Sequence, residues 1–151
     1  MAYLKHSLAT ENDIYFIRET YEENIESLHG NHRTNEDWKK LLEDPSSQYY
    51  IVSREAPVAW FRLDPEGEQL WIGMLQVRPI YHRQGVGKYI LSAVENLARD
   101  TGVKAVGIHT TEDNTAARSL YESAGYGVTE IGPCTTADGI DRVGYTYQKT
   151  V

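Results

Sequence analysis

The sequence predicts a single α/β domain of the α+β kind, with a mixed, mostly antiparallel sheet of about seven strands. Three short apolar runs between residues 48 and 77 follow one another with turn residues between them, which is typical of an antiparallel meander. Segments whose apolar residues recur at helical spacing then alternate with apolar strands. A strand–helix–strand unit joins parallel strands by a right-handed crossover, so we expect one parallel pair in the sheet.

Length and composition favour one soluble domain covering residues 1–151. The hydrophobic fraction is 40% and the charged fraction 25%, which is usual for a globular protein. The single cysteine, Cys134, excludes an internal disulfide and a cysteine-rich metal site, so we expect no metal. No apolar run approaches the ~20 residues of a membrane helix, and the N-terminus lacks a signal-peptide core. We therefore expect a cytoplasmic protein with no membrane partner.

The net charge is −7, because 22 acidic residues face 15 basic ones. This balance argues against nucleic-acid binding, for which a basic patch is expected. It would help to attract a cationic small molecule such as an amine. Solubility alone also explains it.

The N-terminal third predicts one strand and two helices. Residues 3–8 alternate as a short strand, and Thr10 then resembles a helix N-cap. Apolar residues recur at helical spacing up to residue 28, where Gly30 stops the helix. A second helix begins near Thr34 and ends at Pro45, because proline cannot continue a helix interior.

The meander and the C-terminal half follow from the same patterns. The meander strands are 48–53, 58–63 and 69–77, with a turn at Asp64–Gly67. The later elements, in order, are a helix over 85–100, a strand over 104–109, a helix over 114–124, and strands over 126–131 and 143–148, with a loop over 132–142.

The most informative local feature is the glycine-rich turn that links a strand to a helix. Gly85 and Gly87 follow the apolar run ending at Val77 and open the next helix. Glycines let backbone N–H groups approach an anion, and the helix dipole adds positive potential. The turn therefore predicts a phosphate site, although Arg83 and Lys88 taken singly also fit solvated charges.

A second motif runs from Asn114 to Tyr126 and contains Ala117, Tyr121 and Gly125. Together with the glycine turn, it resembles the GNAT (GCN5-related N-acetyltransferase) superfamily. That family's glycine motif usually begins with Arg or Gln at the position of His82, so this chain departs from the pattern there. The resemblance extends to the order of elements over most of the chain.

The resemblance implies the GNAT fold, with helices on both faces of the sheet and a splayed parallel strand pair at the coenzyme A site. It implies acetyl-CoA as cosubstrate, with one strand pairing through its backbone with the pantetheine arm. The residues implied in cofactor binding are Leu75, Gln76 and Val77 for the pantetheine, Arg83, Gln84, Gly85, Val86, Gly87 and Lys88 for the pyrophosphate, and Asn114 for the pantetheine again.

The resemblance also implies how the chemistry is divided. Tyr121 lies about two helical turns from Asn114 and would protonate the departing thiolate as general acid. His109 stands where some relatives carry a glutamate base, and an imidazole is apt for that task near neutral pH. A strand-end histidine without a role, or a relay of waters, would fit as well. No motif surrounds Cys134, so direct transfer is favoured over an acyl-enzyme.

The implied function is that of an acyl-CoA-dependent N-acyltransferase of the EC 2.3.1 class. Its partners would be acetyl-CoA and a primary amine, on a small molecule, a peptide or protein N-terminus, or a lysine. We expect a monomer or homodimer that binds no nucleic acid. One alternative is a catalytically silent acyl-CoA-binding or regulatory module, which Tyr121 disfavours. Another is a Rossmann-type dinucleotide binder, which would need a third glycine where Ile90 stands.

Overall fold

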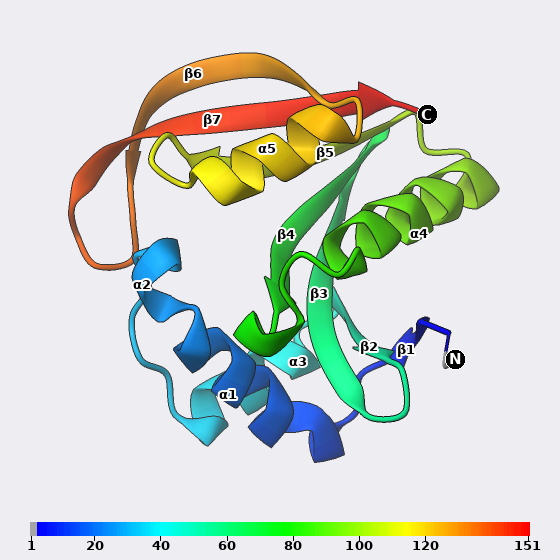
Figure 1. Cartoon of the computed structure of the whole chain (residues 1–151), viewed down its shortest axis with the longest axis vertical. Coiled ribbons are helices and arrows are strands. Elements are labelled where there is room, and N and C mark those ends of the chain that lie inside the picture. Colours follow the sequence, from blue (N-terminus) through cyan, green and yellow to red (C-terminus); the bar gives the residue numbers. More distant parts are fainter. Residues whose placement is uncertain (1–2) are drawn as a thin grey trace.

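A seven-stranded sheet in the order β1-β2-β3-β4-β5-β7-β6 organises the computed structural model, which describes residues 3–151 (Figure 1). All neighbouring strands are antiparallel except β4 and β5, which are parallel. The predicted fold class is therefore confirmed. The strands are β1 (Lys5–Leu8), β2 (Gln48–Ser53), β3 (Pro57–Glu66), β4 (Gln69–Val77), β5 (Ala105–Thr111), β6 (Gly127–Thr135) and β7 (Asp141–Thr150).

The helices begin largely where the sequence predicts. Thr10 and Thr34 each accept a hydrogen bond from a backbone amide and form capping boxes with the residues that follow. Gly102 ends the longest helix in the left-handed conformation, with φ of 77°. The α-helices are α1 (Ile14–Glu23), α2 (Ile25–Leu28), α3 (Asn35–Glu43), α4 (Val86–Thr101) and α5 (Thr115–Ser123), with 3₁₀ turns at Glu11–Asp13 and Pro79–Tyr81.

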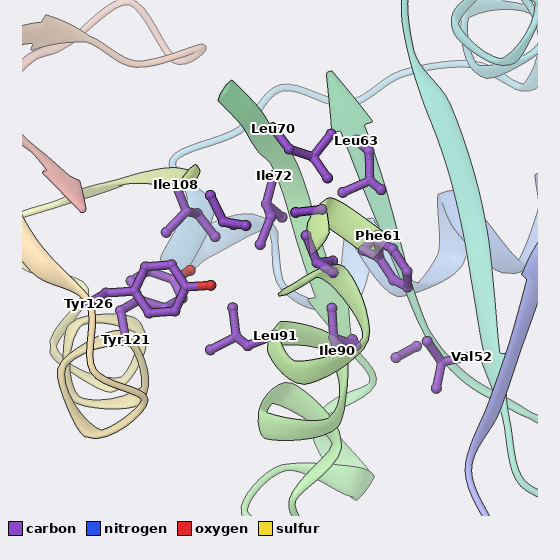
Figure 2. Close-up of a cluster of buried hydrophobic side chains, with 14 of the residues drawn as sticks. Val52, Phe61, Leu63, Leu70, Ile72, Ile90, Leu91, Ile108, Tyr121 and Tyr126 are labelled. Carbon is purple, nitrogen blue, oxygen red and sulfur yellow. The ribbon is translucent and has the colours of Figure 1, made fainter. Parts of the chain in front are cut away.

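Two apolar cores lie on the two faces of the sheet. Alternation along β3 divides them, since Phe61 belongs to the core under α4 and α5 whereas Trp60 belongs to the core under α1 and α3. Ile90 and Leu91 of α4 contribute to the first core (Figure 2). Trp38 of α3 is fully buried in the second core. The sheet is thus covered by helices on both faces.

One predicted helix is interrupted. The sequence predicts continuous helix up to residue 28, but the chain breaks at Asn24, between α1 and α2. The Asn24 side-chain amide donates to the carbonyl of Val77 at 2.9 Å and to Oε1 of Gln76 at 3.1 Å. These bonds to β4 are long-range and invisible in the sequence pattern. The left-handed terminating residue is His29, with φ of 52°, and not Gly30.

Two turns also differ from the sequence prediction. Strand β3 extends to Glu66, so the meander turn falls at Gly67 and not at the predicted Asp64–Gly67 position. The predicted loop over 132–142 is mostly strand, because β6 reaches Thr135 and β7 starts at Asp141. Ladder hydrogen bonds join backbone groups, so pairing continues through glycine- and threonine-rich sequence with little apolar patterning.

The parallel pair separates partway along its length. Pairing of β4 with β5 runs from Gln69↔Ala105 to Ile72↔Ile108 and then ends. Pairing of β4 with β3 continues to Val77. The last residues of β4 therefore have a partner strand on one side alone, which is the splay that the sequence resemblance implied.

A β-bulge lies where this separation begins. Gly73 is the extra residue, since Met74 pairs with Arg62 whereas Ile72 pairs with Leu63. The Arg62 and Asp64 side chains hydrogen-bond to each other at 2.9 Å and occupy the space where a Cβ of Gly73 would lie. A bulge bends its strand and increases the local twist, which accounts for the divergence of β4 from β5.

Candidate functional site

A row of backbone amides without partners leads into α4. Arg83 and Gly85 both have positive φ, at 61° and 81°, and α4 starts at Val86. Within residues 3–151, no amide from Arg83 to Lys88 donates to a backbone or side-chain acceptor. Amides of this kind at a helix N-terminus, where the dipole is positive, form an anion site. The structure thus places the predicted glycine turn in a conformation suited to phosphate.

Arg54 also belongs to this turn and was missed by sequence reasoning. It lies in the β2–β3 turn, and its guanidinium donates to Oε1 of Gln84 at 3.1 Å and to the Gln84 carbonyl at 3.4 Å. Gln84 in turn donates to the carbonyl of Ile80 at 3.2 Å. A permanent positive charge therefore stands beside the free amides. No local motif marks Arg54, because its partner is thirty positions away.

Gly87 has a packing role in addition to its predicted one. A Cβ at this position would lie 2.7 Å from Cδ2 of Leu120 on α5. The absence of a side chain therefore lets the first turn of α4 approach α5 closely. The two sequence motifs, far apart in the chain, meet at this contact.

The open edge of β4 is braced at its end. The carbonyl of Val77 accepts from Nδ2 of Asn24 and from His82, both at 2.9 Å. Gln76 is buried, whereas Leu75 and Val77 are half-buried. His82 therefore supports the strand end that precedes the anion turn.

Helix α5 and its N-cap carry two predicted site residues, Asn114 for the pantetheine arm and Tyr121 for the thioester sulfur. Oδ1 of Asn114 accepts from the amide of Ala117 at 3.2 Å, so Asn114 caps the helix, and its Nδ2 makes no hydrogen bond within residues 3–151. Tyr121 is 6% exposed and belongs to the core in Figure 2, with its ring edge-on to that of Tyr147 at 5.5 Å. Its hydroxyl makes no hydrogen bond within the described residues.

The surroundings of Tyr121 determine its protonation state. Burial raises the pKa of its phenol well above the ordinary value, and the neighbouring Tyr147 adds to the shift. The hydroxyl therefore keeps its proton at neutral pH. The protonated hydroxyl can therefore donate a hydrogen bond to an anion that forms beside it.

A cavity of about 430 Å³ lies between α2, the end of β5 and the β6–β7 hairpin. Asn114 lines it, as does His109 on β5. Thr146 of β7 and Glu130 and Gly132 of β6 contribute further to the lining. The structure therefore brings the predicted base candidate and the predicted pantetheine ligand to one cavity.

The imidazole of His109 is held on two sides. It stacks on the indole of Trp71, with ring centroids 4.7 Å apart and planes within 9°, and Nδ1 lies 2.9 Å from Oγ1 of Thr146. The indole fits against β5 because Gly107 has no side chain in its path. Nε2 of His109 makes no hydrogen bond within residues 3–151, so one ring nitrogen remains available.

Polar contacts close the cavity on the side of α2. His29, just after α2, bonds through Nε2 to Asp113 at 2.8 Å, and its carbonyl accepts from the amide of Asp138 at 3.1 Å. Arg142 binds Asp138 at 2.9 Å. The Thr136 hydroxyl, helped by Arg142, lowers the pKa of Asp138 to about 2. The sequence pattern does not show these contacts, because they join residues far apart in the chain.

The described residues contain neither a metal-binding cluster nor a membrane-spanning helix. Across residues 3–151, no group of three or more His, Cys, Asp or Glu side chains is arranged to hold a metal ion. Nor is any helix in that range long and apolar enough to cross a bilayer. The arrangement that remains is an anion turn, an open strand edge and a polar cavity.

Comparison with protein families identifies one match. Residues 12–126 match the model of the acetyltransferase (GNAT) family. The chain is 35% identical over 75 residues to GCN5-related N-acetyltransferase 10, chloroplastic, of Arabidopsis thaliana, covering 50% of this chain and 29% of that protein. It is 30% identical over 74 residues to the uncharacterized N-acetyltransferase YycN of Bacillus subtilis (strain 168), covering 48% of this chain and 47% of that protein. The match thus spans less than half the length of these curated relatives.

Solved structures share the fold over almost the whole chain. The ribosomal-protein-S18-alanine N-acetyltransferase of Escherichia coli aligns with a TM-score of 0.80 at 17% identity, over 99% of this chain and 94% of that one. The Vibrio cholerae spermidine N-acetyltransferase in complex with CoA and spermine aligns with a TM-score of 0.84 at 13% identity, over 97% of this chain and 95% of that one. The Thermoplasma acidophilum PaiA N-acetyltransferase in complex with coenzyme A aligns at 0.75 and 17%, over 99% of both chains.

The lowered pKa of Asp138 makes a stability prediction. A carboxyl whose folded pKa lies below its unfolded value stabilises the fold above the unfolded pKa, and this contribution disappears as the pH falls through the folded value. Asp138→Asn should therefore lower the free energy of unfolding at about pH 6, and the difference from wild type should vanish as the pH falls below ~2. Urea unfolding across this range measures it. Asp100→Asn, at an exposed helix position, is the control, and a wild-type difference independent of pH would contradict the assignment.

Proposed function

The chain belongs to the acetyltransferase (GNAT) family, and we propose that it transfers an acetyl group from acetyl-CoA directly to a primary amine. The observation that carries this proposal is the separation of β4 from β5 after the Ile72↔Ile108 pair. It leaves an open strand edge between the free amides of Arg83–Lys88 and the cavity at the end of β5. A thioester with a phosphate tail and an amine acceptor could meet at that edge.

The described residues fit coenzyme A. The amides from Arg83 to Lys88, with Arg54 beside them, would hold the pyrophosphate. The unpaired side of Leu75–Val77 would pair with the pantetheine arm as an added strand, and the free Nδ2 of Asn114 would donate to it. The Thermoplasma and Vibrio structures, which share the fold, contain coenzyme A, and this supports coenzyme A as the ligand. The bound thioester supplies an activated acetyl group.

His109 would take the proton of the amine. An alkylammonium has a pKa near ~10 and must lose its proton before it can attack. Nε2 of His109 is available in the cavity, and the bond from Nδ1 to Thr146 with the stack on Trp71 fixes the ring orientation. The imidazole must be neutral to act. It would then pass the proton to solvent.

Tyr121 would stabilise the leaving sulfur. As the amine nitrogen forms the new C–N bond, the C–S bond breaks and its electron pair moves to sulfur. A backbone amide near Leu75 would hydrogen-bond the oxyanion that develops on the carbonyl oxygen. Because burial keeps the Tyr121 phenol protonated, it can hydrogen-bond the sulfur as the C–S bond breaks and give it the proton, and the phenolate would then recover a proton from solvent.

Coenzyme A binding is tested at Gly87. Gly87→Asp should abolish acetyl-CoA binding measured by calorimetry, because it puts a negative charge beside the phosphate site. Gly87→Ala is the matched control, since it creates the same contact with Leu120 without the charge and should weaken binding much less. Wild-type protein should not bind NAD. Normal acetyl-CoA binding by Gly87→Asp would show that the phosphates lie elsewhere.

The role of Tyr121 is tested by removing its hydroxyl. Tyr121→Phe keeps the buried ring and should lower the single-turnover rate by on the order of 10²–10⁴, the usual worth of general acid catalysis. Acetyl-CoA affinity should stay the same. Tyr89→Phe removes a hydroxyl bonded to His6 on the other side of α4 and should leave the rate unchanged. Equal rates for Tyr121→Phe and wild type would remove Tyr121 from the mechanism.

The role of His109 is tested with glutamine. His109→Gln can keep a hydrogen bond to Thr146 but cannot take a proton, so kcat/KM for the amine should fall by roughly 10² or more. Acetyl-CoA binding should be unaffected. His6→Gln, at β1, is the control. If His109→Gln turns over like wild type, water and not His109 carries the amine proton.

A further inference from the structure

The floor of the cavity is built from two rows of residues that cross three adjacent strands. The register aligns Thr111 of β5 with Gly144 of β7 and Gly132 of β6. Two residues along each strand, it aligns His109 with Thr146 and Glu130. Because side chains two residues apart share a face, both rows face the cavity.

The first row leaves an open slot. Gly144 and Gly132 pair with each other and bring no side chains, so the floor there is bare backbone. A Cβ at Gly132 would meet nothing closer than Oε1 of Glu130 at 4.0 Å, whereas one at Gly144 would lie 3.0 Å from Sγ of Cys134. The slot is therefore open over Gly132 and closed beside Gly144 by Cys134. Such a slot suits a slender, unbranched chain.

The second row supplies an unpaired negative charge. Glu130 is the sole carboxylate among the described residues that line the cavity, and the lining contains no Lys or Arg. Glu130 is exposed and has no ion-pair partner in the part of the chain that the structure describes. The nearby Asp113 and Asp138 lie 3.9 Å and 2.9 Å from the Arg142 guanidinium, which offsets part of their charge. Glu130 is therefore the carboxylate of the cavity lining that is available to bind a cation.

We propose that the acceptor is an unbranched diamine, whose reacting amine lies at His109 while its second, charged amine binds Glu130, with its carbon chain in the slot over the glycines of the adjacent row. The two side chains stand on strands that are two spacings apart, about 10 Å between backbones. Glu130 thereby favours an acceptor with a positive charge at the end opposite the reacting amine, and it repels an acceptor with a carboxylate there. This inference rests on the proposed acetyl transfer and adds the substrate class to it.

Three acceptors with the same carbon chain test the role of Glu130. Diaminobutane, butylamine and aminobutyrate place a positive, a neutral and a negative group at the far end. Wild type should prefer them in that order, with kcat/KM for the diamine about 10- to 100-fold above that for butylamine, the range of a charged hydrogen bond. Glu130→Gln should remove the preference for the diamine, and Glu130→Lys should favour aminobutyrate.

The glycine floor is tested on the same strand. The Cβ of Gly132→Val meets no steric conflict in the fold and valine suits a strand, but its side chain would fill the slot. It should raise KM for diaminobutane at least tenfold while acetyl-CoA binding stays unchanged. Gly127→Val is the matched control, because a Cβ there also meets nothing within 4 Å and lies outside the cavity lining. It should behave like wild type.

A binding measurement separates this inference from the proposed function. Calorimetry of the protein saturated with coenzyme A, titrated with diaminobutane, needs no turnover. Binding that weakens in Glu130→Gln supports the diamine site even if no acetyl transfer occurs, which would overturn the proposed function alone. The diamine site would be overturned if butylamine and diaminobutane were acetylated with the same kcat/KM and Glu130→Gln had no effect on either. The proposed function would still stand.

Discussion

The early end of pairing between β4 and β5 is the constraint on which the other features depend. Ile72 and Ile108 form the last pair, and the bulge at Gly73 turns β4 away while its ladder with β3 continues. The hydrogen-bonded Arg62 and Asp64 side chains leave no room for a side chain at Gly73. A continuous ladder would fill both the open edge and the space between the two strands. The proposed meeting of thioester and amine requires that this ladder stay broken.

Glycines allow close packing around this opening, because they have no side chain. Gly87 brings the first turn of α4 against Leu120, so the anion turn and helix α5 are positioned together. Gly107 admits the Trp71 indole, on which His109 stacks. In both places a tertiary contact orients a residue of the proposed chemistry, and a methyl group would displace it.

The two sides of the opening differ in electrostatics, as a two-substrate site requires. The turn before α4 offers free amides and the Arg54 guanidinium, which suit phosphate. The cavity at the hairpin contains the Glu130 carboxylate and the His109 imidazole, whose Nε2 has no hydrogen bond within residues 3–151. Both groups suit an amine. The hydroxyl of Tyr121, in the core under α4 and α5, is buried and protonated. Charge alone would therefore direct each substrate to its own side.

The sequence by itself determined the order of elements, the caps at Thr10 and Thr34, the parallel crossover and the glycine turn, because each depends on neighbouring residues or a fixed period. It also identified Tyr121 and His109 as candidates, and their roles remain predictions. Tertiary structure alone decided the helix break at Asn24, the long β6–β7 hairpin, the position of Arg54 and the row that joins His109 to Glu130. These features arise from hydrogen bonds and strand pairing between segments far apart in the chain, which leave no local pattern of hydrophobicity or spacing.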